Sequence, residues 1–542
     1  MSAAKAAQKR VNPWVVMAFI AIPVFVGSLD LTVVSAFLPE LITHLDLPLQ
    51  TALDDAAWIV SGYLLAYAIS LTFMGRVSDL LGRRAVYVAC LSLFMLGSLL
   101  VATAHQWPTE TLYTLFRRMG QRPDIAEMNL LAIIVGRVIQ ALGAGALVPV
   151  SLALVGDIFP EGARARPLGL IGALDTLGWV LGHLYGGLLV QFMPWQGLFW
   201  INLPLTLLAL LAVLWALRHV PQQRASGRFD FLGVALIAGA LTALNLGLGA
   251  NVDIPVGVSN FEQLSPLPEH AGPVLFIALL CFLAFVYVEA RVKDPLMRLQ
   301  MFRRRNLSMG ALTNLFVGYG IFIGLVSVPI LINVRQQSFE QLTEAALTVG
   351  LLLSTLTVPM ALAAVPGGWL SDRIGYARTT MLGLALAAVG FLLVWQTWTL
   401  DISDGLVALE MALVGIGLGL TFSPISAAVI NDAKDDERGV ASALVIILRL
   451  VGMTVSISSL TALSLTRIGQ LVNVALGDAT SVDPSLYAEV YARSSVQVLA
   501  EIGLIGAVIC LLAMIPAALL RGGKREGETQ PAKSGIISQS EA

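Results

Sequence analysis

The chain has 542 residues, of which 57% are hydrophobic and only 13% are charged, and its mean hydropathy is +0.81. Soluble domains have about 25% charged and about 45–50% apolar residues. The composition therefore excludes an ordinary soluble protein and indicates an all-α integral membrane protein. The 33 basic and 35 acidic residues leave a net charge of −2 without a basic face, which excludes a nucleic-acid binder. The three cysteines lie in apolar runs and predict no disulfide framework.

Apolar stretches of about 20 residues, the length needed to cross roughly 30 Å of hydrocarbon, recur along the whole chain. The first is too long for a signal peptide and lacks a small-residue cleavage site, so we expect a transmembrane helix there. In chain order, fourteen helices are predicted to begin near Trp14, Ala57, Val86, Leu130, Pro167, Leu198, Asp230, Gly272, Leu307, Ala345, Thr379, Leu406, Val440 and Ala500.

The distribution of arginine and lysine tests this helix count independently, because the cytoplasmic loops of membrane proteins are enriched in both. With both termini in the cytoplasm, most of the 33 basic residues fall in predicted cytoplasmic segments, and Arg137 and Arg449 lie within helices. The predicted outer segments contain only Arg117, Arg118, Arg122, Arg335, Arg467 and Arg493. The bias supports an even number of helices and a multi-pass protein of the cell (inner) membrane.

The second and tenth predicted helices end in related segments. Residues 75–82 and 368–375 both read Gly-x-x-Ser-Asp-x-x-Gly at a predicted cytoplasmic helix end. Two halves with the same polarity are typical of a parallel repeat, related by an axis normal to the membrane. One such match is a weak signal, but two copies in equivalent topological positions predict a duplicated membrane fold.

Further segments carry a resemblance to a known family. They are residues 28–35 in the first helix, 75–84 between the second and third, 137–145 in the fourth (an RxxQGxGaG-like motif) and 199–204 at the entry of the sixth (an FxINxP-like motif). In these segments the chain resembles the major facilitator superfamily, in its fourteen-helix drug:proton antiporter branch. The resemblance covers nearly the whole chain. It implies the major facilitator fold, with two six-helix bundles and two extra helices between them.

The helix map and the resemblance together predict five regions. They are a cytoplasmic N-terminus (1–13), a first bundle (14–217), the two extra helices with their linkers (218–306), a second bundle (307–520) and a disordered tail (521–542). Within the first bundle, the outer segment 105–129 is longer than its family counterpart. Its apolar residues have helical spacing, so it forms either a helix in the outer interface or an ordinary loop.

Two details refine the resemblance. Residues 58–60, leading into 75–79, together with residues 449–453, are most similar to the mycobacterial members that export triacylglycerides and glycolipids. The antiporter signature of the fifth helix, GPxxGG, departs from its pattern here, because residues 182–187 have His183 in the place of the proline. Because of this departure, the resemblance alone does not assign antiport chemistry to this chain.

Few ionisable residues lie inside the predicted helices. Burying one at a helix centre costs about 2.5–3.5 kcal/mol on insertion scales, so each is a functional candidate. Asp30 shares a helix face with Pro23 and Gly27, which predicts a cavity wall. We expect Asp30 and Arg449 to pair across the two bundles in at least one conformation, so that protonation of Asp30 biases the conformational equilibrium. The alternative is that each is satisfied within its own bundle.

Three further groups complete the candidates for proton coupling. Arg137 is placed to pair with Asp175 or with Asp30, and the resemblance supports a role for it in proton transfer. Asp175 and His183 lie on one arc of the fifth helix, roughly 12 Å apart, too far for a direct hydrogen bond. They are two stations of a relay or polar contacts for a substrate, unless His183 is an ordinary structural histidine.

The duplicated motif predicts a gate on the cytoplasmic side. Asp79 and Asp372 end their helices where a carboxylate interacts favourably with a neighbouring helix N-terminus, by about 0.3–1 kcal/mol. We expect such contacts to hold the cytoplasmic side shut, although the arginines also act as topology determinants. The predicted gate residues are Gly75, Asp79, Gly82, Arg83, Gly368 and Asp372.

The energy source and substrate follow from what the helices contain. The sequence has no P-loop, no hydrolase or zinc motif and no cofactor or metal motif, so we expect an ion gradient to drive transport and no enzymatic activity. Polar and aromatic groups among aliphatics suit a large amphipathic molecule better than a sugar. The cavity candidates are Phe37, Tyr63, Tyr67, Asn314 and Tyr319.

These features predict a monomeric, proton-coupled exporter of small lipophilic compounds, drugs or lipids, that works by alternating access. A second hypothesis is a triacylglyceride or glycolipid translocase that feeds the cell envelope. A third is a receptor or scaffold on the same fold, against which the ionisable groups retained inside the membrane argue.

Overall fold

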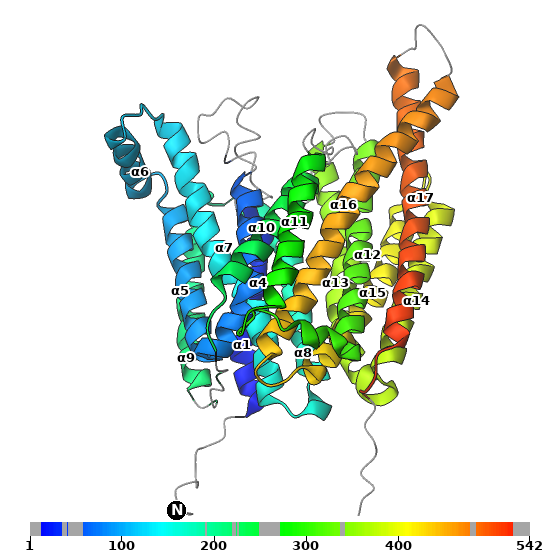
Figure 1. The fold of residues 1–542 in the computed structure, drawn as a ribbon. Coiled ribbons are helices and arrows are strands. Elements are labelled where there is room, and N and C mark those ends of the chain that lie inside the picture. Colours follow the sequence, from blue (N-terminus) through cyan, green and yellow to red (C-terminus); the bar gives the residue numbers. More distant parts are fainter. Residues whose placement is uncertain are drawn as a thin grey trace, which may run out of the picture.

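The first six long helices form one bundle in the computed structural model (Figure 1). Pro13 begins α1, where a missing backbone donor has no cost, and the Asp124 carboxylate caps α7 by accepting from the Ala126 amide at 3.1 Å. The long helices are α1 (Pro13–Val33), α4 (Trp58–Leu81), α5 (Arg83–Ala102), α7 (Ile125–Ile158), α8 (Ala165–Leu189) and α9 (Gln196–Leu217). The structure describes residues 12–34, 41, 58–189, 192–218, 220, 224, 227–248, 271–335, 342–476 and 484–523.

Six further helices form the second bundle, and two helices lie between the bundles in the sequence. The second bundle contains α12 (Arg305–Arg335), α13 (Leu342–Ile374), α14 (Tyr376–Thr397), α15 (Asp404–Asp432), α16 (Arg438–Leu476) and α17 (Pro484–Ala518). The extra pair is α10 (Phe231–Leu248) and α11 (Ala271–Glu289), and short 3₁₀ turns occupy Glu161–Ala163 and Leu299–Arg303. The part of the chain that the structure describes contains no strand.

These helices match the fourteen predicted spans in order. Thirteen helices among the described residues are long and apolar enough to cross a membrane. The remaining one, α8, has 25 residues, and at about 1.5 Å per residue it is longer than roughly 30 Å of hydrocarbon. The predicted all-α fold of two six-helix bundles with two extra helices is therefore confirmed.

The repeated sequence motif produces the same turn twice. Gly82 separates α4 from α5 with φ at 95°, and Gly375 separates α13 from α14 with φ at 94°. Only glycine adopts this left-handed backbone region without steric cost. Each glycine thus allows an immediate reversal of the chain at the same end of its bundle. We call this end, where α1 begins, the basal side; the opposite end is the apical side.

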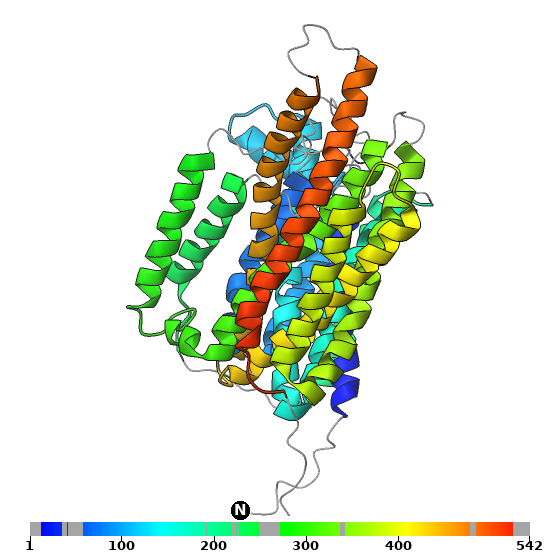
Figure 2. The ribbon, with the colours of Figure 1, turned by 90° about the vertical axis from the view of Figure 1, so that its right-hand side faces the viewer.

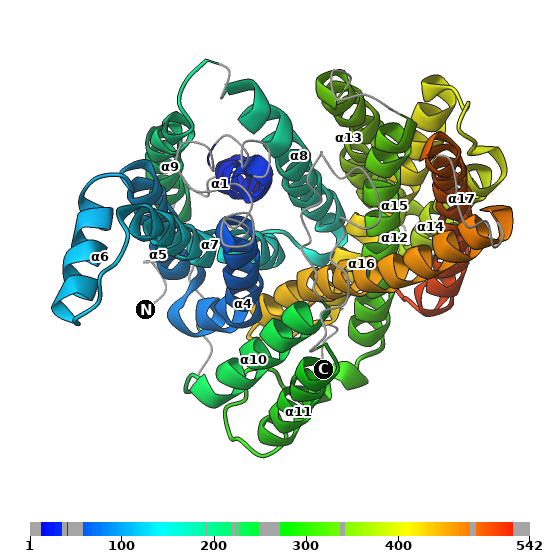
Figure 3. The same ribbon diagram turned by 90° about the horizontal axis from the view of Figure 1, so that it is seen from above.

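The bundles meet along two seams, where α8 packs against α13 and α4 packs against α16. Seen from above, α10 lies against α4 and α16 and covers the second seam, while α11 covers α10 (Figure 3). The face of α11 away from α10 is exposed and apolar, with Phe276, Leu279 and Leu283 about half accessible. This composition is that of a helix surface in contact with lipid.

Two apical features extend beyond the bundles. The segment predicted as an interfacial helix or a loop contains a helix, α6 (Trp107–Arg118), which lies at the periphery beside α7 and exposes Leu115. The helices α16 and α17 have 39 and 35 residues, well above the about 20 that a membrane requires. They rise above their neighbours on the apical side (Figure 2).

Glycines let the helices of the second bundle approach closely, which gives a test of the packing. A Cβ at Gly419 of α15 would collide with the carbonyl oxygen of Met360 in α13. We expect Gly419→Ala to lower the free energy of unfolding by about 1–3 kcal/mol, the usual cost of overpacking. Thermal unfolding of the purified protein in detergent measures the change. Gly350→Ala is the control, because its Cβ would meet no atom within 4 Å; equal stability of the two variants would contradict the packing.

Candidate functional site

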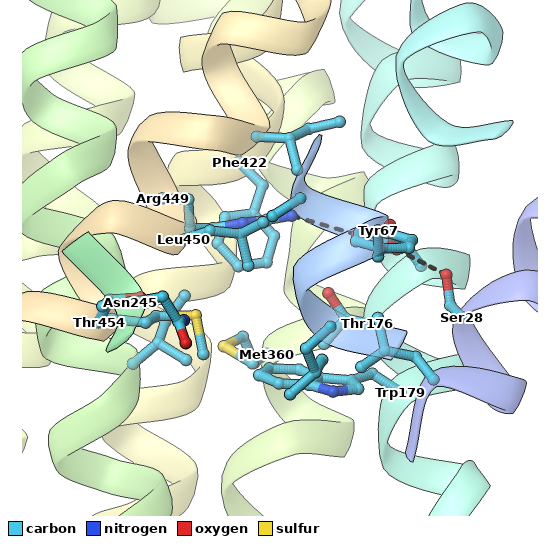
Figure 4. A pocket seen from close by; sticks show the side chains of 17 residues that line it. Ser28, Tyr67, Thr176, Trp179, Asn245, Met360, Phe422, Arg449, Leu450 and Thr454 are labelled. Carbon is cyan, nitrogen blue, oxygen red and sulfur yellow. Dashed lines mark hydrogen bonds and ion pairs between the residues drawn. The ribbon is translucent and has the colours of Figure 1, made fainter. Parts of the chain in front are cut away.

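A cavity of about 100 Å³ lies between the two bundles, near the middle of the helices (Figure 4). Its wall is mainly aliphatic and aromatic, with a few polar groups among them. It is lined by Ser28, Leu31, Leu64, Tyr67, Ala68, Asp175, Thr176, Trp179, Asn245, Ile321, Met360, Phe422, Ile446, Arg449, Leu450, Met453 and Thr454. Both bundles contribute to this wall, so any relative motion of the bundles changes the shape of the cavity.

An ion pair crosses the cavity from one bundle to the other. The guanidinium Nη2 of Arg449, on α16, lies 3.1 Å from Oδ2 of Asp175, on α8. The Ser28 hydroxyl of α1 donates to Oδ1 of Asp175 at 2.7 Å. Their side chains are 17% and 16% exposed, and the Arg449 guanidinium also lies 5.0 Å from the centre of the Phe422 ring. This pair is therefore open to the cavity.

A second ion pair is sealed inside the first bundle. Arg137 Nη1 on α7 lies 2.6 Å from Asp30 Oδ2 on α1, and both side chains are completely buried. The other oxygen of Asp30 accepts from Gln140 at 3.0 Å and from Asn202 at 2.7 Å. The Arg137 guanidinium lies 3.9 Å above the ring of Tyr63. Because α1, α4, α7 and α9 all contribute, this network fastens the bundle internally.

The predicted pair between Asp30 and Arg449 is not formed in this conformation. Asp30 lies about 200° around the helix from Ser28, and Ser28 rather than Asp30 faces the cavity. The stripe through Pro23, Gly27 and Asp30 faces the interior of the first bundle instead. Arg137 is predicted to pair with Asp175 or with Asp30, and in the structure it pairs with Asp30. The contact of Arg449 does cross the bundles, but its partner is Asp175.

On the basal side, the first copy of the duplicated motif contacts the second bundle. The Gly439 amide at the N-terminus of α16 donates to Oδ1 of Asp79 at 3.1 Å. A Cβ at Gly75 would collide with the Gly439 carbonyl, so this glycine allows α4 and α16 to touch. Arg83 pairs with Asp79. This is the contact between a carboxylate and a helix N-terminus that the sequence predicts for Asp79.

Asp157, at the end of α7, extends this basal network. It lies 3.2 Å from Arg83 of its own bundle and 3.0 Å from Arg438 of α16. The second copy of the motif forms a related contact at the other seam, where Asp372 of α13 lies 3.5 Å from Arg166 of α8. A Cβ at Gly368 would lie 2.7 Å from the Ala165 carbonyl. The basal ends are thus joined at both seams.

The other candidates lie in different places. Among the aromatic cavity candidates, Tyr67 lines the cavity, whereas Tyr63 is buried beneath Arg137. Asn314 donates to the Val445 carbonyl and Tyr319 shares a hydrogen bond with Ser459, so both serve the contact of α12 with α16 rather than the cavity. Phe37 and the side chain of His183 fall outside the described residues.

Sequence reasoning missed two groups. Asn245 comes from α10, one of the extra helices, and lines the cavity together with residues of both bundles; a lone amide in an apolar span is the signal that could have identified it. Asp157 joins the seam, but its position at the end of an apolar span resembles an ordinary interfacial residue. Among the described residues, no group of three or more His, Cys, Asp or Glu residues is placed to hold a metal ion.

The two ion pairs differ in burial, which predicts different costs of removal. Asp30→Ala leaves Arg137 fully buried without its carboxylate, so we expect a loss of about 3–5 kcal/mol in the free energy of unfolding. Asp175→Ala leaves Arg449 beside a cavity, so we expect a smaller loss. Thermal unfolding in detergent compares the two. A larger loss for Asp175→Ala would contradict the distinction between a sealed pair and an open pair.

Known proteins are similar to this chain in sequence and in architecture. The model of the Major Facilitator Superfamily matches residues 20–457 and 338–538. A triacylglyceride transporter of Mycobacteroides abscessus is 32% identical over 81% of this chain and 80% of its own length. A triacylglyceride transporter of Mycobacterium tuberculosis is 30% identical over 94% of both chains.

Solved structures agree on the fold. The human organic anion transporter MFSD10 superposes with a TM-score of 0.54 at 17% identity, covering 94% of this chain and all of its own. The proton:xylose symporter XylE gives 0.55 at 14% identity, covering 92% of this chain and 94% of its own. Identities this low bear on the fold alone. Sequence, helix arrangement and duplicated basal motif agree, and the chain belongs to the major facilitator superfamily of membrane transporters.

Proposed function

We propose that this chain is a proton-coupled lipid exporter that works by alternating access, with triacylglyceride-like molecules as its substrate class. The observation that carries the proposal is the Asp175–Arg449 pair, because it joins the two bundles inside the cavity. The names of its relatives support a lipid substrate. The arginine distribution supports a basal side that faces the cytoplasm and a location in the inner membrane.

Protonation of Asp175 supplies the coupling. A proton that neutralises the Asp175 carboxylate removes most of its attraction to the Arg449 guanidinium. Arg449 then loses its counter-ion, and the bundles are free to reorient about the cavity. The conformation in which Asp175 binds the proton better is populated at the expense of the other. Asp30 is a poorer candidate, because its network is closed to the cavity.

The proton gradient provides enough energy for this cycle. One charge that moves down 100 mV releases about 2.3 kcal/mol. At about 1.4 kcal/mol per tenfold ratio, this sustains roughly a fortyfold gradient of a neutral substrate. A single coupling carboxylate therefore suffices.

The cavity wall and volume support a large apolar substrate that enters only when the bundles separate. A volume of about 100 Å³ is smaller than the roughly 300–1,000 Å³ of typical ligand pockets, and far less than a lipid with three acyl chains needs. The contacts between the basal ends support a cavity that is closed on that side. The wall offers aliphatic and aromatic side chains with few polar groups, which suits acyl chains and ester groups rather than a sugar.

The coupling role of Asp175 can be tested directly. In Asp175→Asn the amide still accepts from Ser28 but no longer titrates, so we expect at least a tenfold loss of transport driven by an imposed pH gradient. Proteoliposomes with a fluorescent triacylglyceride analogue measure this transport. Binding of the analogue should change little, because asparagine keeps the size and shape of this side chain in the cavity wall.

Asp30→Asn is the matched control, because it carries the same change in a pair that is closed to the cavity. We expect it to transport with the pH gradient if it folds, which size-exclusion chromatography verifies. Loss of gradient-driven transport in Asp30→Asn alone, with Asp175→Asn unaffected, would move the coupling site to Asp30. Export of drugs in resistance assays without any transport of the lipid analogue would contradict the substrate class.

Asn245 allows a separate test of the cavity. It is the contribution of α10 to the wall among the described residues, so Asn245→Leu replaces a polar substrate contact by an apolar one. We expect a change of severalfold in the apparent KM for the lipid analogue with little change in the pH dependence of transport. Leu246→Ala, on the exposed side of the same helix, is the control. An equal change in both variants would indicate a general effect on α10.

A further inference from the structure

Two carboxyl groups meet at the basal end of the extra helix pair, far from the cavity. Asp230 directly precedes α10, and Glu289 is the last residue of α11. Their exposed fractions are 9% and 4%, although acidic residues at helix ends are usually accessible to water. Neither residue belongs to the duplicated motif or to the Asp30–Arg137 and Asp175–Arg449 pairs.

Each carboxyl group has one oxygen with a donor and one without. The Gly233 amide donates to Oδ1 of Asp230 at 2.9 Å, and the Met297 amide donates to Oε2 of Glu289 at 3.0 Å. The other two oxygens, Oδ2 of Asp230 and Oε1 of Glu289, are buried and receive no hydrogen bond from the described residues. A Cβ at Gly233 would collide with both of these oxygens. The two atoms therefore converge on the same small space.

Two ionised carboxylates do not remain in such an arrangement, because like charges that share a buried site favour the protonation of one of them. A proton between the two oxygens converts the repulsion into a charge-assisted O–H···O hydrogen bond, among the strongest that proteins form. We propose that Asp230 and Glu289 share one proton, so that the α10–α11 pair is a proton-binding site separate from Asp175.

The charged groups around the pair do not neutralise the two carboxylates in place of this proton. Asp230 is the charged neighbour that acts on Glu289, and its other neighbours on this side are the backbone amides of Leu296 and Met297. Two charged groups from neighbouring elements flank Gly227, which lies three residues before Asp230: they are Asp294, which accepts from the Arg228 amide at 3.0 Å, and Arg76 of α4. A Cβ at Gly227 would lie 2.9 Å from Oδ1 of Asp294 and 3.3 Å from Nη2 of Arg76.

The position of the site connects it to the basal seam. The segment that caps Glu289 continues into Arg298 and Arg304, which lie 3.3 and 2.8 Å from the carboxylate of Glu437. Glu437 directly precedes α16, whose Gly439 contacts Asp79. A proton on the pair holds α10, α11 and this segment together. As the pH on the basal side rises and the proton leaves, the two carboxylates repel and the attachment loosens.

Infrared difference spectroscopy of the purified full chain in lipid nanodiscs tests the shared proton. Spectra recorded at about pH 5 and about pH 9 should contain the carbonyl band of a protonated carboxyl group, which shifts in deuterium oxide. We expect Glu289→Gln and Asp230→Asn each to remove the same component of this band. Glu410→Gln is the matched control, because Glu410 is fully buried but accepts from both Thr397 and Trp398, and it should leave the component in place.

Thermal unfolding is a second measurement, which also serves if one of the variants folds poorly. Thermal unfolding of the wild type should show a loss of stability as the pH rises, because the native state binds a proton that the unfolded chain releases earlier. This part of the pH dependence should be absent in Glu289→Gln, whose amide donates to Asp230 at every pH. Unchanged spectra in both variants would overturn the proposal. So would stabilisation of the wild type at high pH by added Na⁺ or Mg²⁺, which would identify a metal cation in place of the proton. Neither readout depends on the transported molecule.

Discussion

The architecture of the centre depends on the cost of leaving a charge unpaired in hydrocarbon. Arg449 lies in the first half of α16, and a guanidinium without a partner inside the membrane costs several kcal/mol. Its carboxylate, Asp175, belongs to the other bundle, so the two bundles must remain in register for the charge to be neutralised. The same requirement is met inside the first bundle by Arg137 and Asp30. One of these pairs fixes a bundle internally, and the other fixes the relation between bundles.

Contacts across the two seams also join the bundles at the basal side. Glycines bring the backbones of α4 and α16 together, and also those of α8 and α13, because both copies of the motif place a glycine one turn before an aspartate. The first copy adds a network that includes Asp157 and Arg438. In the second copy, Asp372 lies 3.5 Å from the partly exposed Arg166, and Arg164 donates to Asn431 of α15 at 2.8 Å. Both seams are therefore joined at the basal side, and α10 covers the α4–α16 seam.

The helices, their order and the duplicated motif could be predicted from the sequence, because apolar length and charge bias act locally along the chain. Depth could also be predicted, since the rise per residue is fixed. What could not be predicted is the direction in which a residue faces. Ser28 and Asp30 differ by only two positions, yet one faces the cavity and the other the bundle interior. This rotation is set by the packing of α1 against α7, α8 and α9, and packing of this kind depends on partners far away in the sequence. Asn245 was missed for the same reason.

The length of α16 has a mechanical consequence. It is one helix of 39 residues without an internal proline, roughly 58 Å long at about 1.5 Å per residue. Near its basal end are Arg438 and Gly439, in its first half is Arg449, and its far end projects beyond the apical surface. A continuous helix held at Arg449 acts as a lever with unequal arms. A small tilt that separates the short basal part of α16 from its contacts moves the long apical part further, and in the opposite direction.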